Sequence, residues 1–119
     1  VKHLNIREDE NNVDLRDSIT DYISGCCLFV HSKIVKKLKG FDENFNMYME
    51  DVDFCLRAKH QGIQSYFLAS PLAFHYVSAS VKRKPFKIIN SYIKLSIKHT
   101  GIYSIFNVPL FILRKILFS

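Results

Sequence analysis

The sequence is poor in the residues that mark fibrous, linker and disulfide-rich proteins. It has no tryptophan, four glycines, three prolines and three cysteines in 119 residues, and no segment repeats. Such a composition excludes a collagen-like chain and a low-complexity linker. Cys26, Cys27 and Cys55 are odd in number and contain no C-x-x-C pair, so they fit neither a disulfide framework nor a zinc site. We expect the thiols to be reduced and the protein to be cytoplasmic.

Long apolar runs are also absent. No stretch approaches the roughly 20 apolar residues that cross a bilayer, and residues 1–5 lack the apolar core of a signal peptide. We therefore do not expect the chain to span a membrane. Apolar material is nevertheless ample, because 48% of the residues are hydrophobic and 13% are aromatic. The chain is expected to be globular.

Acidic residues are missing from one end of the chain. The net charge is +6, from 17 basic and 11 acidic residues. Residues 82–119 hold eight bases and no acid, a charge of +8, so residues 1–81 keep nine bases, 11 acids and a charge of −2. The eight are Lys82, Arg83, Lys84, Lys87, Lys94, Lys98, Arg114 and Lys115. Any anionic surface that the protein meets is expected to meet this end.

The hydrophobic pattern predicts alternating strands and helices in the first two thirds of the chain. In order, we expect an irregular lead-in (residues 1–18), a buried strand (22–30), a helix (33–39), a loop (41–49), a helix (50–61) and two short strands (64–69 and 72–76). Ser32 is expected to cap the first helix, and Gly40 and Gly62 to end the two helices in left-handed conformations.

The basic end predicts an amphipathic helix after Pro85 and then a second apolar segment. The apolar side of the helix is expected to be Phe86, Ile89, Tyr92, Ile93 and Ile97, and the polar side Lys87, Asn90, Ser91, Lys94 and Lys98. Residues 105–118 are too few to span a bilayer and too apolar to lie in water alone. This segment is expected to bury itself against another surface.

Three carboxylates are crowded at the expected start of the second helix. Glu50, Asp51 and Asp53 fall within four positions and follow a loop that is dense in aromatic residues and methionine. Such a loop beside acids can line a sugar site. Acids in a first helical turn are also favoured by the helix dipole and cap free N–H groups, so a structural role stays open. Asp53 and Arg57 are spaced to form an ion pair that braces the helix.

The cluster lies within an ordered set of four short motifs. They are Gly40-Phe41-Asp42-Glu43, Met47-Tyr48, Glu50-Asp51-Val52-Asp53-Phe54-Cys55-Leu56-Arg57-Ala58 and Gly62. Their order and spacing resemble glycosyltransferase family 2, the rhamnosyltransferase-like members especially, over about residues 22–80. The resemblance implies an α/β fold, with a partial GT-A mixed sheet and flanking helices in residues 19–81. It makes this segment the acceptor-side, C-terminal half of a catalytic domain, and residues 82–119 form the amphipathic helical tail.

The resemblance also implies a reaction. A hydroxyl of a glycan or lipid-linked acceptor attacks the anomeric carbon of a nucleotide-sugar donor with inversion, in the synthesis of cell-surface polysaccharide. Asp51 matches the family's general base, and Glu50 is expected beside it in catalysis. The residues expected to contact substrate are Gly25, Tyr48, Asp53 and Arg57. For Gly25, a simple strand irregularity is an equal alternative.

A divalent metal, Mn²⁺ or Mg²⁺, is implied at the leaving diphosphate. The family binds it with an Asp-x-Asp motif in a nucleotide-binding half that this sequence does not contain, and His75 stands where relatives add a ligand. A lone histidine among aromatic residues is more often structural, so that alternative stays open. Without the other half, we expect the chain alone to be inactive and, with an unpaired sheet edge, to self-associate.

Two alternative functions remain. The residues that match a calcium-binding loop are Asp42, Asn44, Asn46, Glu50 and Asp53, although Met47 replaces the glycine that such a loop needs. The basic helices over residues 86–119 would instead make a membrane-surface module, which is compatible with an enzyme on the cytoplasmic face of a membrane. We do not expect a nucleic-acid partner, because the tail's phenylalanines lie among aliphatic residues and not between basic ones.

Overall fold

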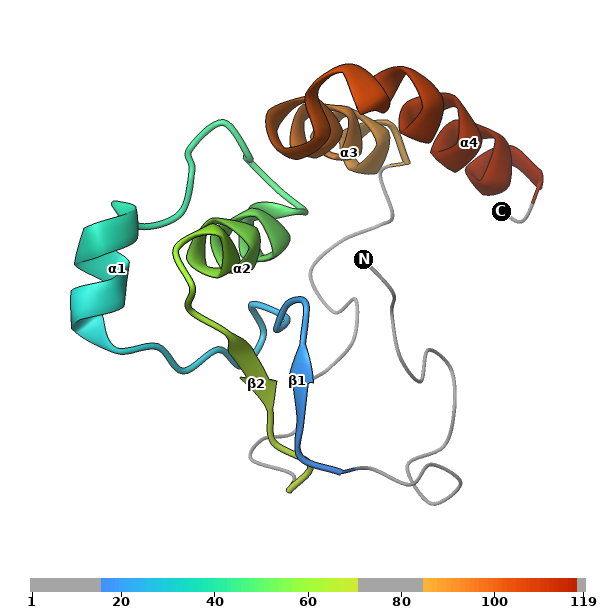
Figure 1. Cartoon of the computed structure of the whole chain (residues 1–119). Coiled ribbons are helices and arrows are strands. Elements are labelled where there is room, and N and C mark those ends of the chain that lie inside the picture. Colours follow the sequence, from blue (N-terminus) through green and yellow to red (C-terminus); the bar gives the residue numbers. More distant parts are fainter. Residues whose placement is uncertain (1–15, 71–84, 118–119) are drawn as a thin grey trace. The chain divides into compact units, whose positions relative to one another are not determined.

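A computed structural model describes residues 16–70 and 85–117 (Figure 1). The elements are β1 (Ser18–Thr20), α1 (Ser32–Leu38), α2 (Glu50–His60), β2 (Ser65–Phe67), α3 (Pro85–Thr100), the 3-10 helix η2 (Gly101–Tyr103) and α4 (Ser104–Leu117). The predicted mixture of helices and strands is confirmed. The described residues form two compact units, residues 16–42 with 51–70 and residues 43–50 with 85–117. The expected strand over 72–76, and most of the lead-in, lie outside the described residues.

The sheet of the first unit has two strands. β1 and β2 are antiparallel, and Ser18, Ile19 and Thr20 pair with Phe67, Tyr66 and Ser65. Its second strand lies within the segment 64–69 that was expected to be extended. Its first strand begins inside the expected lead-in, because a polar stretch can pair at a sheet edge without burying its side chains. Even Ile19, the apolar residue of this strand, is 61% exposed.

The predicted buried strand over residues 22–30 is wrong. The segment is irregular, with a turn in which the Cys27 N–H donates to the Ser24 carbonyl at 3.3 Å. Two of its other N–H groups donate to side chains of α2 and not to a neighbouring strand. The segment is not uniformly buried either, since Phe29 is 80% exposed. An apolar run alone cannot distinguish a ladder partner from such side-chain acceptors.

Helix α1 begins one residue earlier than expected and has a different cap. His31, not Ser32, is the N-cap, and its Nδ1 accepts a hydrogen bond from the Lys33 N–H at 3.1 Å. At the other end both Lys39 and Gly40 are left-handed, and the Gly40 N–H donates to the Val35 carbonyl. The expected glycine stop is therefore confirmed. Lys39 adopts the same conformation although it has a Cβ.

Helix α2 contributes most of the first unit's core. Phe54 and Ala58 of α2 are buried with Leu38 of α1, and the partly buried residues packed on them are Leu28, Ile34, Val35 and Ile63. Burial of a side chain the size of Phe54 or Leu38 contributes about 1.5–3 kcal/mol. Gly62, with φ 75°, ends the helix as predicted, and the following Ile63 N–H donates to the Ala58 carbonyl.

Helices α3 and α4 of the second unit pack on each other (Figure 1). The rings of Tyr92 and Phe111 are stacked, with their centres 3.7 Å apart. The predicted helix after residue 84 is confirmed, but its predicted faces are partly wrong. Phe86 is 85% exposed, whereas Ser91 is buried. The reason is that the Ser91 hydroxyl donates to the carbonyl of Met47 in the loop before α2. None of the helices that the structure describes combines the length and apolar character needed to cross a bilayer.

Candidate functional site

The carboxylate of Asp51 is fixed by two backbone donors. Its Oδ2 accepts a hydrogen bond from the Gly25 N–H at 2.9 Å, and its Oδ1 accepts one from the Val52 N–H at 2.8 Å. Asp51 itself is half-buried in the first turn of α2. Each carboxylate oxygen has a second lone pair that these bonds do not use. The group is therefore held in place and still able to accept a proton.

Gly25 contacts the predicted base directly. A Cβ built on Gly25 would lie 3.5 Å from the Asp51 Cβ and 3.7 Å from its Oδ2, which is ordinary contact, and its φ is not in the left-handed region. Neither space nor φ demands a glycine here. The structure shows one contribution of Gly25, which is the N–H group that it donates to Asp51. Contact between Gly25 and substrate stays a prediction.

Tyr22 is a further neighbour of Asp51, and the sequence did not single it out. Burial raises the pKa of the Tyr22 phenol above its usual value of 10.0, and the negative charge of Asp51 raises it further, with a smaller contribution from Cys55. The phenol therefore senses the charge on the predicted base. No sequence signal could have found this pair, because the two residues are distant in the chain and share no motif.

The turn into α2 is strained. Tyr48 and Met49 both have left-handed backbones, with φ of 68° and 71°. For residues with a Cβ this conformation costs roughly 1–2 kcal/mol each, and such strain is most often kept where a site requires it. It sets the direction in which the chain enters the Glu50-Asp51 pair. Contact between Tyr48 and substrate stays a prediction.

Glu50 carries an unsatisfied acceptor. Its Oε2 is buried and has no hydrogen-bond partner among the residues that the structure describes. A buried polar atom without a partner costs about 1–3 kcal/mol, partly offset here because a carboxylate at a helix N-terminus is stabilised by the helix dipole. Glu50 Oε2 can therefore accept a hydrogen bond, for example from a hydroxyl group.

Asp53 and Arg57 have a structural role. Asp53 is fully buried, with 0% exposed area, and its Oδ2 accepts a hydrogen bond from Arg57 Nε at 2.7 Å. The two other nitrogens of the guanidinium donate to the carbonyls of Leu38 and Gly40 at the end of α1. The predicted ion pair is confirmed, and it also joins the two helices. Substrate contact by either residue stays a prediction.

No metal cluster is found in the part of the chain that the structure describes, where no three His, Cys, Asp or Glu side chains are grouped to hold an ion. His75 lies outside the described residues. Asp53 cannot join Asp51 in an Asp-x-Asp metal site, because its carboxylate is paired with Arg57. The same pairing removes the last ligand of the calcium loop considered above. The described residues alone therefore do not fit a metal.

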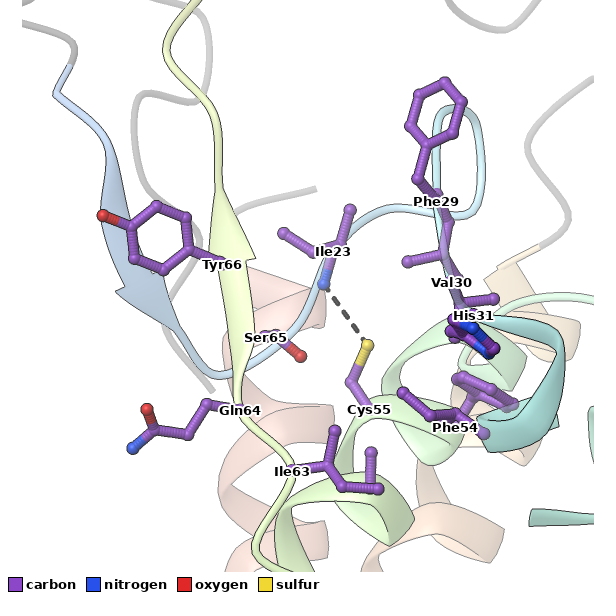
Figure 2. A pocket seen from close by; sticks show the side chains of 13 residues that line it. Ile23, Phe29, Val30, His31, Phe54, Cys55, Ile63, Gln64, Ser65 and Tyr66 are labelled. Carbon is purple, nitrogen blue, oxygen red and sulfur yellow. Dashed lines mark hydrogen bonds between the residues drawn. The ribbon is translucent and has the colours of Figure 1, made fainter. Parts of the chain in front are cut away.

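A hollow of about 220 Å³ lies elsewhere in the first unit, between the segment before α1, helix α2 and strand β2 (Figure 2). Apolar side chains such as Leu28, Ile34 and Phe54 line most of it, together with His31 and Gln64. Figure 2 shows the Ile23 N–H directed at the Cys55 sulfur, 3.5 Å away. Asp51, Glu50 and Tyr48 do not line this hollow, so it is separate from the acidic cluster.

Comparison with known proteins identifies relatives. The chain is 34% identical over 85 residues to N-acetylglucosaminyl-diphospho-decaprenol L-rhamnosyltransferase of Mycobacterium tuberculosis, a match that covers 67% of this chain and 28% of the relative. It is 32% identical over 60 residues to rhamnosyltransferase WbbL of Escherichia coli K12, covering 50% of this chain and 23% of that protein. No protein-family model and no solved structure matches.

The chain thus spans less than a third of the length of the curated relatives that it matches. Both relatives are rhamnosyltransferases, and they come from different bacteria. The resemblance expected from the motifs around Glu50 and Asp51 is confirmed. Over about two thirds of its length, the chain is a rhamnosyltransferase-like segment of glycosyltransferase family 2.

Proposed function

We propose that this chain is the acceptor-side part of an inverting GT-A glycosyltransferase with Asp51 as its general base. The observation that carries the proposal is the Asp51 carboxylate, which the N–H groups of Gly25 and Val52 hold at the start of α2. A base must keep its position while it accepts a proton, and two backbone donors from separate segments provide this. The names of the relatives point to L-rhamnose as the transferred sugar. We propose cell-surface polysaccharide as the product.

In the proposed step, the acceptor hydroxyl gives its proton to an Asp51 oxygen while its own oxygen forms a bond to the anomeric carbon. The bond from that carbon to the nucleoside diphosphate breaks, and its electron pair leaves with the diphosphate. In this proposal Glu50 accepts a hydrogen bond from the acceptor, and its buried Oε2, which has no partner among the described residues, supports that role. A positioned base contributes about 10²- to 10⁴-fold in rate.

A divalent cation, Mn²⁺ or Mg²⁺, remains part of the proposal as the group that neutralises the leaving diphosphate. Its ligands would come from outside the described residues, with His75 as the candidate within this chain. Binding of the nucleotide-sugar is likewise assigned to other parts of a complete enzyme. We therefore propose that the 119 residues by themselves transfer no sugar.

The test uses a full-length protein that contains this segment. Asp51→Asn keeps an acceptor oxygen for the Gly25 N–H but is a far weaker base, so kcat is expected to fall by about 10²- to 10⁴-fold with donor binding retained. Glu43→Gln, which changes an exposed acid of the preceding loop, is the matched control and should leave kcat nearly unchanged. Wild-type turnover in Asp51→Asn would refute the base assignment.

A membrane surface is the second functional proposal, and the exposed apolar area of the second unit favours it. Large apolar side chains of η2 and α4 are exposed to 53–75%: Ile102, Tyr103, Ile105, Phe106, Leu110 and Leu113. Together with the basic residues of the segment, they suit the cytoplasmic face of a membrane with anionic lipids. Such a location also suits a lipid-linked acceptor.

Vesicle flotation tests this second proposal. The chain is expected to float with vesicles that contain phosphatidylglycerol, and the double variant Phe106→Ser, Leu110→Ser to float much less. Phe29→Ser is the control, because Phe29 is 80% exposed but belongs to the first unit. Equal flotation of all three proteins would exclude this surface.

Self-association is proposed from the first unit. Its two-stranded sheet leaves Ile19, Tyr66 and Leu68 at least half exposed, an apolar edge that a second chain can cover. Sedimentation at increasing concentration should show dimers or larger species. A strictly monomeric profile at high concentration would contradict it.

A further inference from the structure

Helix α3 holds the loop that leads to the acidic pair. The Ser91 hydroxyl donates to the Met47 carbonyl at 2.8 Å, and the Lys94 ammonium donates to the Asn44 carbonyl at 3.0 Å. The Lys98 ammonium lies 5.6 Å from the centre of the Phe45 ring, which is buried. All of these contacts lie within the second unit. The loop over residues 43–50 is thus attached to one side of α3.

The exposed apolar side chains of α3 lie on a different side of the helix. At 3.6 residues per turn, Phe86 and Ile97 are displaced by roughly a third of a turn or more from Ser91. Phe86 is 85% exposed and Ile97 57% exposed. One side of α3 therefore holds the loop while another remains open to a partner. The exposed apolar residues of η2 and α4 already described belong to the same unit.

Charge determines which partner suits this open side. Residues 82–119 hold eight bases and no acid, so this segment as a whole is positively charged. A second copy of the same segment would meet its own positive charge, whereas an anionic lipid surface offers the opposite charge and an apolar interior. We take the lipid surface as the occupant.

We propose that binding of α3 and α4 to an anionic lipid surface stabilises the loop over residues 43–50, and so orders the entry to Glu50 and Asp51. The inference rests on the membrane-surface proposal. Its physical basis is linkage, because a ligand that binds only the folded helices shifts their opening equilibrium. Because Ser91 and Lys94 donate these hydrogen bonds to carbonyls of the loop, the loop loses them whenever α3 opens.

Hydrogen exchange of the full chain measures this coupling. Amides of residues 43–50 are followed by mass spectrometry with phosphatidylglycerol vesicles, with phosphatidylcholine vesicles and without lipid. With anionic lipid at about ten times its dissociation constant, their exchange is expected to slow by about tenfold. Phosphatidylcholine vesicles are expected to slow it much less, because they lack the negative charge.

Ser91→Ala separates lipid binding from the loop. It removes the hydrogen bond to Met47 but keeps every charge, and alanine is compatible with a helix. We expect unchanged flotation and circular dichroism, with loop exchange in bound protein about two- to tenfold faster than in the wild type. Asn90→Ala, at an exposed neighbouring position, is the control and should behave as wild type.

The possible failures are distinct. If the chain floats with anionic vesicles but loop exchange is unchanged, the coupling is wrong and the membrane surface stands. If the chain does not float at all, both are wrong. If Ser91→Ala and Asn90→Ala show equal loop exchange on vesicles, α3 does not hold the loop through Ser91.

Discussion

The Gly25 N–H donates a hydrogen bond to the Asp51 carboxylate at 2.9 Å, joining the irregular segment before α1 to the first turn of α2. The sequence suggested both residues as site residues without indicating that they touch. The contact means that the backbone of Gly25, and not its missing side chain, positions the predicted base.

The effect of a substitution at Gly25 on stability should therefore depend on whether the new residue keeps the backbone N–H. Gly25→Ala keeps the N–H, and its Cβ would meet Asp51 at ordinary contact distance, so stability should change by no more than about 0.5 kcal/mol. Gly25→Pro removes the donor and should cost about 1.5–3 kcal/mol, since hydrogen bonds to charged groups are stronger than average. Urea unfolding of both variants measures the difference. Equal losses in the two would show that the N–H is not the important group.

Titration of Tyr22 should report the charge of Asp51. Because burial is the larger cause of its raised pKa and Asp51 the second, Asp51→Asn should lower the Tyr22 pKa while leaving it above 10.0. Tyrosine absorbance or NMR of the labelled ring follows the titration. An unchanged Tyr22 pKa in Asp51→Asn would mean that the two groups do not interact.

The same raised pKa has a consequence for stability at high pH. The folded protein holds the phenol proton more tightly than the unfolded chain does, so this stabilisation is complete below pH 10. It is lost as the pH rises from that value through the folded pKa. Tyr22→Phe should reduce this loss in unfolding experiments above pH 10.

Loss of one partner from the buried Asp53–Arg57 pair should lower stability far more than loss of the exposed pair that Lys59 of the same helix makes. Asp53→Ala leaves a guanidinium that is only 20% exposed without its carboxylate partner, which should cost about 3–5 kcal/mol. Lys59→Ala breaks the exposed pair with Asp21 and should cost about 0–1 kcal/mol. Thermal or urea unfolding compares them. Similar losses would contradict a structural role for the buried pair.

Arginine itself is expected to be required at position 57. Its planar group binds Asp53 and two carbonyls at the end of α1, which a single ammonium cannot do in the same geometry. Arg57→Lys should therefore lose most of the stability lost in Arg57→Ala. Near wild-type stability of Arg57→Lys would show that only the charge matters.

Acid should weaken the Asp21–Lys59 pair in a defined direction. The hydrogen bond and charge of Lys59 lower the pKa of Asp21 below its usual value of 3.8. This contribution is present above pH 3.8 and is lost as the pH falls through the folded pKa. In Lys59→Ala the pKa of Asp21 should return toward 3.8, which carboxyl NMR detects. No movement of that pKa would exclude the pair in solution.

Local chemistry allowed several elements to be predicted. Helical patterns that end at Gly40 and Gly62 indicated α1 and α2, and the lack of periodicity between them indicated a loop. The stop at Gly62 and the ion pair between Asp53 and Arg57 both form within one helix or at its end. A short-range sequence pattern was therefore sufficient to predict them. The motifs around Asp51 also indicated the family, which the rhamnosyltransferase relatives confirm.

Contacts between distant segments could not be predicted in this way. The run over residues 22–30 is apolar enough for a strand, but its N–H groups bond to Asp51 and Cys55, acceptors that no local pattern reveals. Ser91 fell on the polar side of a helix, yet it is buried because it holds Met47.

Residue type and spacing along the chain were enough to indicate the acidic helix start, the glycine stops, the basic tail and the family. The different surroundings of Asp51 and Asp53 became known from the folded chain alone. The fold placed Asp53 in the core with Arg57 and left Asp51 half-buried beside Gly25 and Tyr22. The reason is physical: burial and hydrogen-bond partners depend on how distant segments pack, and two aspartates in the same motif can meet opposite surroundings.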